Sequence, residues 1–174
     1  MARKDLPLIS RRLLLAASLA PAAAWAAPAR PKIITMLGDS ITAGLGLARP
    51  DALPAQLHAA LTRLGVAVTV RGAGVSGDTS AAGLARTDFS VQSDTNLCIV
   101  ALGGNDLLQG LDVRQTRANL TAIVRKLKAR RIGVLITGQK APRAIGAAFA
   151  RDFDASFAQV AAAEHVALYP NLLD

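Results

Sequence analysis

Apolar residues along this 174-residue chain follow two patterns that alternate with each other. In the first, short runs are rich in β-branched residues, which predicts β-strands at residues 32–37, 66–71, 97–102, 132–137 and 166–169. In the second, longer segments have the spacing of amphipathic helices, which predicts helices over residues 53–63, 81–86, 113–130 and 144–164. Asp112 with Gln115 forms a capping-box pattern before the third of these helices.

Regular alternation of predicted strands and helices indicates βαβ units with right-handed crossovers. Such units build a parallel sheet that is covered on both faces, so the expected fold class is α/β. Ligands of these sheets bind beyond the carboxyl ends of the strands. The loops that follow the predicted strands are therefore where chemistry is expected.

The N-terminus has the pattern of an export signal. Four basic residues precede an apolar run over residues 13–24, and small residues at Ala24 and Ala26 follow; the basic residues are Arg3, Lys4, Arg11 and Arg12. This pattern predicts a signal peptide over residues 1–26 with cleavage after Ala26. Residues 27–174 then form one domain, which their length and composition fit.

The leader also indicates where the protein is delivered. Residues 10–15, Ser-Arg-Arg-Leu-Leu-Leu, resemble a twin-arginine export signal. The alternative, an uncleaved membrane anchor, is disfavoured because the apolar run is shorter than the roughly 20 residues that a spanning helix needs. We expect a periplasmic or secreted protein with no stable membrane anchor, whose partners include the export machinery.

The net charge of +8 invites a nucleic-acid interpretation. However, the leader holds four basic residues and one acidic residue, so 16 basic and 11 acidic residues remain and the rest of the chain carries +5. A basic cluster falls in the second half of a predicted helix, where cations complement the helix dipole; its members are Arg125, Lys126, Lys128, Arg130 and Arg131. A solvated helix end is favoured over a phosphate-binding patch, and no nucleic-acid partner is expected.

Cys98 is the only cysteine. With one cysteine, the chain can form neither an intrachain disulfide nor a cysteine-based metal site. Because Cys98 lies in an apolar run without a basic neighbour, we expect a buried, unreactive thiol.

The loop after the first predicted strand brackets a serine with glycines. Its sequence, residues 38–44, is Gly-Asp-Ser-Ile-Thr-Ala-Gly. A serine at a strand-to-helix turn has an exposed hydroxyl, and the amides and dipole of a helix start favour the negative charge that develops when an ester carbonyl is attacked. The alternative is that Ser40 only caps the helix.

Two further loops carry distinctive residues. Residues 72–77 fit G-x-G-x-x-G, yet a dinucleotide site needs a helix that opens at once and an acidic residue after the next strand, and both are absent from the pattern. Residues 103–106, Gly-Gly-Asn-Asp, place an amide donor after the third strand, although Asn and Asp are also ordinary turn residues.

Together these loops resemble the conserved blocks of the SGNH (GDSL) hydrolase family, in particular its bacterial acyl-CoA thioesterase, protease and lysophospholipase (arylesterase) branch. The resemblance spans about residue 33 to the end and includes residues 76–80 and 83–86, Ser-Gly-Asp-Thr-Ser and Gly-Leu-Ala-Arg. It implies a flavodoxin-like three-layer α/β/α sandwich with a parallel sheet of about five strands.

The resemblance also implies roles for particular residues. Ser40 would be the nucleophile, and the Ser40 amide, the Gly77 amide and the Asn105 side chain would form the oxyanion hole. Asp39 and Asp106 would support these loops. No metal or cofactor is implied, and the expected partner is a small ester, a thioester or a lysophospholipid.

The family's last block, Asp-x-x-His, has no counterpart in the sequence. His58 falls in a predicted helix and His165 just before the fifth predicted strand, so neither is a convincing substitute for the catalytic base. We expect a truncated sequence that also lacks the closing C-terminal helix, and the activity of the 174 residues alone is then doubtful. The alternative is a non-catalytic domain that binds acyl or sugar esters and has lost its histidine.

Overall fold

The computed structural model describes residues 31–173. The expected signal peptide over residues 1–26, its twin-arginine motif and its cleavage site lie outside the described residues. Among residues 31–173, no helix is long and apolar enough to cross a bilayer.

Five parallel strands form one sheet: β1 Lys32–Gly38, β2 Val68–Gly74, β3 Leu97–Ala101, β4 Gly133–Thr137 and β5 Ala167–Tyr169. Their order is β2-β1-β3-β4-β5. From β1 the chain continues to β2 on one side of β1 and then to β3 on the other side. A topological switch point therefore lies between β1 and β3. Parallel sheets open a ligand crevice at that point, outside the carboxyl ends of the strands.

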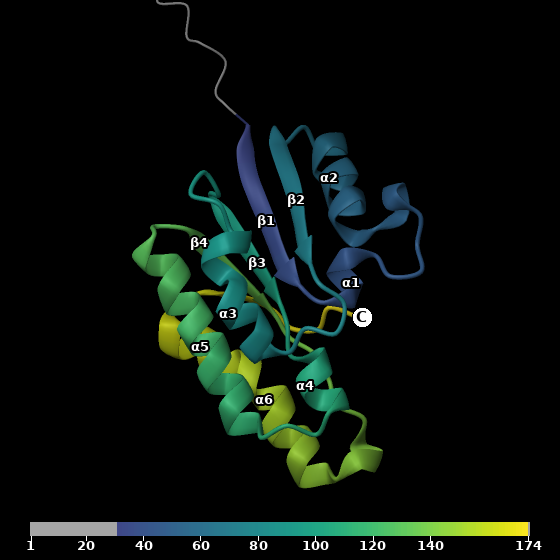
Figure 1. The fold of residues 1–174 in the computed structure, drawn as a ribbon, viewed down its shortest axis with the longest axis vertical. Helices are drawn as coiled ribbons and strands as arrows, with labels where there is room; N and C mark the ends of the chain where they lie inside the picture. The colour runs from purple at the N-terminus through teal and green to yellow at the C-terminus, as the bar shows by residue number, and fades with distance from the viewer. Residues whose placement is uncertain (1–30, 174) are drawn as a thin grey trace, which may run out of the picture.

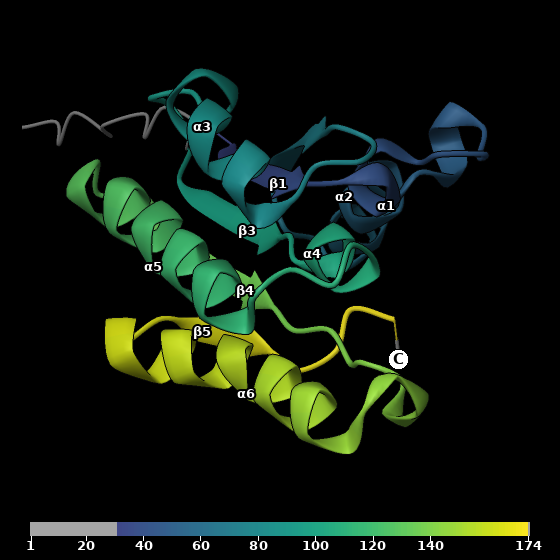
Figure 2. The ribbon, with the colours of Figure 1, turned by 60° about the horizontal axis from the view of Figure 1, so that its bottom comes forward.

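Helices lie on both faces of this sheet (Figure 1). The α-helices are α1 Ser40–Ala43, α2 Leu53–Arg63, α3 Ser80–Ser90, α4 Gly104–Leu108, α5 Val113–Ala129 and α6 Ala147–Glu164, and two 3-10 turns are η1 Arg49–Asp51 and η2 Arg143–Ile145. Helix α5 runs beside both α3 and α6 (Figure 2). The expected α/β fold with a parallel sheet of five strands is confirmed.

Strand residues alternate between two apolar clusters. On one face, Ile34, Met36 and Ile99 are buried against leucines of α2. On the other face, Cys98 and Val100 join a larger cluster with α5 and α6, whose fully buried members include Leu120, Ile123, Leu127, Phe153 and Phe157. This period of two along each strand is what a sheet covered on both sides requires.

Most predicted elements form, with shifted ends. The helix over 53–63 is observed with those bounds. The second strand begins at Val68 and continues to Gly74, because residues 72–74 pair with the end of β1. The short helix α4 was not predicted, since one turn contains too few residues for a helical period, and α1 was expected only as the start of a helix at Ser40, without bounds.

One local expectation is corrected at α5. Asp112 caps the helix by accepting a hydrogen bond from the Arg114 amide, but the Gln115 side chain donates to Asn119 at 3.0 Å and completes no capping box. The basic end of the helix is solvated, as expected, since the side chains of Arg125 and Lys126 are 71% and 44% exposed. Its cations meet acceptors within the chain: Arg125 pairs with Glu164 at 2.7 Å and Lys126 with Asp88 at 2.6 Å.

Cys98 lies fully buried in the larger cluster, as expected. Burial raises the pKa of its thiol to about 12. The thiolate is the reactive form of cysteine, so this side chain is chemically inert at neutral pH.

Candidate active site

Ser40 is the first residue of α1, directly after β1. Asp39 caps this helix, because its Oδ1 accepts a hydrogen bond from the Ile41 amide at 3.0 Å. Gly44 then ends the helix in a left-handed conformation with φ 75°. Since α1 has only four residues, the full helix dipole that the sequence suggested behind Ser40 is not present, and the local donors are the amides of this turn.

Two glycines let α1 sit tightly on the strand ends. A Cβ on Gly38 would lie 2.0 Å from Thr42 Oγ1, and a Cβ on Gly74 would lie 2.3 Å from the Ala43 amide nitrogen. Any side chain at either position would push the helix away from the sheet. The position of Ser40 is therefore set by close contact of backbone with backbone.

The second loop turns over residues 75–78 and is closed by a hydrogen bond from the Asp78 amide to the Val75 carbonyl at 3.2 Å. Gly77 occupies the third position of this turn with φ 87°. A type II turn needs a positive φ there, which glycine adopts without strain. Space around Gly77 is open, because a Cβ there would meet no atom within 4 Å.

Helix α3 begins at Ser80, with Thr79 as its cap. Asp78 and Thr79 therefore separate Gly77 from the helix. This interval contradicts the Rossmann-like interpretation of residues 72–77, in which the helix must open at the glycines to receive a pyrophosphate.

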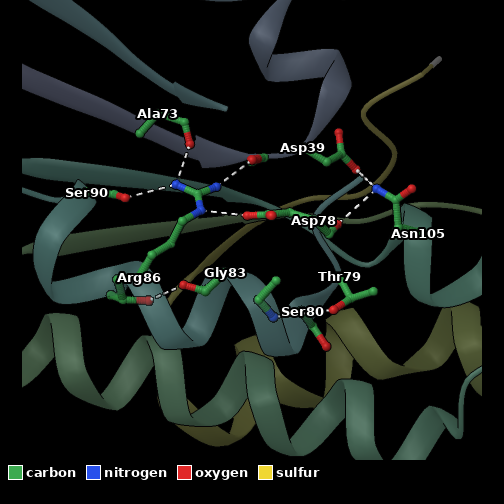
Figure 3. A network of polar contacts seen from close by, with 12 residues as sticks. Asp39, Ala73, Asp78, Thr79, Ser80, Gly83, Arg86, Ser90 and Asn105 are labelled. Atoms are coloured by element: carbon green, nitrogen blue, oxygen red, sulfur yellow. Dashed lines mark hydrogen bonds and ion pairs between the residues drawn. The ribbon is translucent and has the colours of Figure 1, made fainter. Parts of the chain in front are cut away.

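Asn105 lies in α4, which follows β3 after Gly103 in a left-handed conformation with φ 113°. Its side-chain Nδ2 donates to the Asp78 carbonyl at 2.9 Å and reaches Asp39 Oδ2 at 3.5 Å. One amide thus contacts residues of both other loops, as Figure 3 shows. The three loops singled out in the sequence meet at one place.

A cavity of about 480 Å³ opens beside Ser40. Its polar lining comes from Asp39, Ser40, Asn105, Gln139, Lys140 and Asn171, and its apolar lining includes Ile41, Leu107, Leu108, Pro142, Ile145 and Leu173. Gly77 does not line the cavity but precedes Asp78 in the adjoining turn. The site therefore combines a hydroxyl, an amide donor and an apolar pocket of small-molecule size.

The pKa of the Asp39 carboxyl group is shifted by its surroundings in the site. Burial raises its pKa above the ordinary value of 3.8, the charges of Asp78 and Asp106 raise it further, and the hydrogen bond from Ile41 opposes both. The side chain is 3% exposed, and its oxygens already face Ile41 and Asn105. This geometry suits a group that holds the loop in place.

Asp106 points away from the cavity into a buried polar network. Its carboxylate accepts hydrogen bonds from the Ser80 amide at 2.7 Å, from the Ser80 hydroxyl at 2.5 Å and from Thr116 Oγ1 at 3.0 Å. Asn119 donates to the same serine hydroxyl at 2.9 Å. The start of α3 and the side of α5 are thereby fastened to α4, which carries Asn105.

Neither described histidine is near Ser40. His58 is exposed on α2, and His165 is exposed at the end of α6, before β5 begins. Because the sheet is parallel, His165 lies at the amino end of the strands while Ser40 lies at the carboxyl end. Within residues 31–173, no histidine is placed to accept the proton of Ser40.

Two residues of the site, Arg86 and Gln139, were not assigned a role from the sequence. Arg86 stood in a recognised motif without an assigned role, yet its guanidinium holds the loop of Gly77 and Asp78. Gln139 lines the cavity and is 6% exposed, and its Nε2 has no hydrogen-bond partner in the described part of the chain. A polar residue directly after an apolar strand was the only sequence signal for Gln139.

The sheet order, and the serine that follows β1 beside the switch point, define a class of α/β proteins with a serine at a strand-to-helix turn. The chain belongs to the GDSL-like lipase/acylhydrolase family, whose model matches residues 36–172. This confirms the family resemblance that the loop motifs indicated.

Relatives and solved structures agree with that assignment. Esterase TesA of Pseudomonas aeruginosa is 35% identical over 84% of this chain and 73% of its own length. Thioesterase 1/protease 1/lysophospholipase L1 of Escherichia coli is 32% identical over 81% of this chain and 67% of its own length. The crystal structure of AlinE4, an SGNH-hydrolase family esterase, superimposes with a TM-score of 0.79 at 42% identity, covering 82% of this chain and 77% of that one.

Proposed function

We propose that this protein is a serine esterase that hydrolyses carboxylic esters or thioesters through an acyl intermediate on Ser40. The observation that carries the proposal is the position of Ser40, which faces an apolar cavity next to the amide side chain of Asn105. A nucleophile, an oxyanion donor and a pocket for an apolar substrate are the parts that acyl transfer needs.

In the proposed reaction, Ser40 Oγ attacks the carbonyl carbon and its proton passes to a base. The carbonyl π electrons move to the oxygen, and the resulting oxyanion is held by the amides of Ser40 and Gly77 and by Asn105 Nδ2. Collapse of the tetrahedral intermediate expels the alcohol or thiol, which takes up the proton. Water then attacks the acyl-serine by the same steps and releases the acid.

The hydrogen bonds of Asn105 support its part in this scheme. One Nδ2 hydrogen is engaged with the Asp78 carbonyl at 2.9 Å, whereas the other spans 3.5 Å to Asp39. A contact of that length is weak. The second hydrogen can turn to an oxyanion while the first keeps the side chain in place.

The base is assigned by family resemblance alone. It would be the histidine of an Asp-x-x-His block, which the 174 residues do not contain. No proton-transfer step is therefore ascribed to His58 or His165, and experiments on turnover should use protein expressed from the complete reading frame.

The proposed substrates are simple esters, aryl esters, thioesters and lysophospholipids. The mainly apolar lining of the cavity suits an acyl or aryl group, and the relatives include proteins named as an esterase, a thioesterase and a lysophospholipase. We further propose export to the periplasm or the medium, on the basis of the leader pattern. In that location esters and lysophospholipids are more accessible substrates than cytoplasmic acyl-CoA.

The test is hydrolysis of p-nitrophenyl butyrate, with covalent labelling by a fluorophosphonate probe. We expect turnover and labelling of the wild type, and loss of both in Ser40→Ala. Hydrolysis that survives in Ser40→Ala would refute the proposal. Binding of an acyl ligand without turnover or labelling would instead favour the non-catalytic binding domain, which the absence of a histidine near Ser40 within residues 31–173 keeps as the second candidate.

A further inference from the structure

Arg86 lies in the second turn of α3, and its guanidinium points toward the ends of β1 and β2 (Figure 3). Nε donates to Asp78 Oδ2 at 2.5 Å, and Nη2 donates to the Gly38 carbonyl at 2.8 Å. Nη1 donates to the Ala73 carbonyl at 2.9 Å and to Ser90 Oγ at 3.0 Å. Four of the five guanidinium hydrogens are thus engaged.

Three of the four acceptors of Arg86 come from two of the three site loops. The Gly38 carbonyl belongs to the peptide that leads into Asp39 and Ser40, and the Ala73 carbonyl stands at the end of β2. Asp78 directly follows Gly77. This planar side chain, together with the hydrogen bond from the Val75 amide to the Gly38 carbonyl at 3.0 Å, therefore fixes the spacing between the turn of Ser40 and the turn that carries the proposed Gly77 donor.

Asp78 is held from two sides. Its carboxylate bonds to Arg86, and its backbone carbonyl accepts the amide hydrogen of Asn105 at 2.9 Å. The side chains of Arg86 and Asp78 are only 18% and 11% exposed, so this ion pair is shielded from bulk solvent. Gly77 itself has open space around it, and the hydrogen bonds of Asp78 are therefore the main restraint on its amide.

We propose that Arg86 is a positioning residue that fixes the oxyanion donors through Asp78, an inference that rests on the proposed esterase function. Oxyanion stabilisation depends on donors that are already oriented when the charge develops. Removal of the guanidinium leaves the Asp78 carboxylate without its ion-pair partner and takes one of two donors from the Gly38 carbonyl, which still accepts from the Val75 amide. The turn over residues 75–78 then moves, and the transition state is stabilised less while ground-state binding in the cavity is retained.

The test compares Arg86→Gln and Arg86→Lys with the wild type, in protein expressed from the complete reading frame and checked for folding by circular dichroism. For Arg86→Gln we expect kcat to fall about 10- to 100-fold, less than the about 100- to 1,000-fold that follows the loss of a donor itself. We expect KM to stay within about threefold, the pattern of an interaction made in the transition state. Arg86→Lys keeps the charge but not the planar fork, so it should recover only part of kcat.

Two controls separate positioning from general stability. Arg71→Gln breaks another Arg–Asp pair, more exposed and outside the site, in which Arg71 contacts Asp94 at 2.6 Å, and it should leave kcat unchanged. The inhibition constant of a trifluoromethyl ketone, which forms a tetrahedral adduct on the serine, should rise in Arg86→Gln by the same factor as kcat/KM falls. A partly unfolded sample would lower the active-site titre and leave that constant unaltered.

A double-mutant cycle with Asp78→Asn tests whether Arg86 affects kcat through Asp78. If Arg86 acts through Asp78, the double variant should be little worse than either single variant. Additive losses, a normal kcat in folded Arg86→Gln, or an effect confined to KM would each overturn the proposal. Should Arg86→Gln fail to fold, Arg86→Lys and Asp78→Asn provide the same comparison. Full activity of Ser40→Ala would refute the esterase function itself, which is a separate outcome.

Discussion

Asn105 donates its side-chain amide to the backbone carbonyl of Asp78 across 2.9 Å, so the second and third loops of the site are joined without any ligand. The same amide nitrogen reaches Asp39, beside Ser40, at 3.5 Å. The site is thus assembled by the fold and does not depend on a substrate to bring its parts together. Each of the following predictions tests one part of that assembly.

Replacing Asn105 with alanine should lower kcat for an ester substrate about 100- to 1,000-fold, because a preorganised oxyanion donor is lost. Steady-state kinetics with p-nitrophenyl butyrate measure the change. Asn96→Ala is the matched control, since Asn96 accepts a hydrogen bond from the Ile33 amide at the opposite end of the sheet. An equal loss of kcat in both variants would contradict the role of Asn105.

Gly77→Ala should cost about 1 to 2 kcal/mol of stability, because an L-residue is strained at a left-handed φ. The altered turn should also displace the Gly77 amide and lower kcat. Gly46→Ala is a close control: Gly46 has φ 80° and equally open surroundings, in the loop after α1. Urea denaturation should show similar costs for the two variants, and only Gly77→Ala should lose kcat.

Gln139→Met should stabilise the protein by about 1 kcal/mol, because it removes a buried donor without a partner and nearly conserves volume. Differential scanning calorimetry should show Tm raised by about 2 to 4 °C. Gln139→Ala removes the same donor but leaves a void, so its Tm should fall. A lower Tm for Gln139→Met would mean that the amide is satisfied in solution.

Asp39→Asn should be more stable than the wild type at neutral pH. Burial raises the pKa of Asp39, so the folded protein binds this proton more tightly than the unfolded chain does. The wild type therefore loses stability as the pH rises from 3.8 through the raised pKa, while the amide has no charge to bury and still accepts from Ile41.

The measurement is urea denaturation at a series of pH values. The advantage of Asp39→Asn should shrink toward zero below pH 3.8, where both side chains are neutral. Asp94→Asn should behave with the opposite sign. The Arg71 guanidinium lowers the pKa of Asp94, so that carboxylate stabilises the protein above pH 3.8 and its contribution fades in acid.

Sequence patterns predicted the fold well where an element was long. The helix over 53–63 and the start of β1 at Lys32 have enough periodic residues to be recognised. The end of β2 was misplaced because glycines carry no strand preference, and residues 72–74 join the sheet only through their pairing with β1. Helices α1 and α4 are single turns fixed by tertiary contacts.

The candidate site was predictable for a geometric reason. Loops after neighbouring parallel strands meet at one edge of the sheet, so Ser40, Gly77 and Asn105 were expected together although they are far apart in sequence. Arg86 was different. Two of its acceptors are the backbone carbonyls of Gly38 and Ala73, and the pattern of side chains in a sequence does not predict which backbone carbonyls accept hydrogen bonds from an arginine.

The close packing of α1 against the strand ends has a practical consequence for redesign. On the side of Ser40, the strand ends have no room for a Cβ atom at Gly38 or Gly74, so substitutions at these positions cannot enlarge the cavity. Another part of the cavity rim is built from Pro142, Ile145 and Leu173, of which Ile145 is 50% and Leu173 is 69% exposed. Mutant libraries aimed at bulkier molecules should therefore randomise that rim and leave the glycines alone.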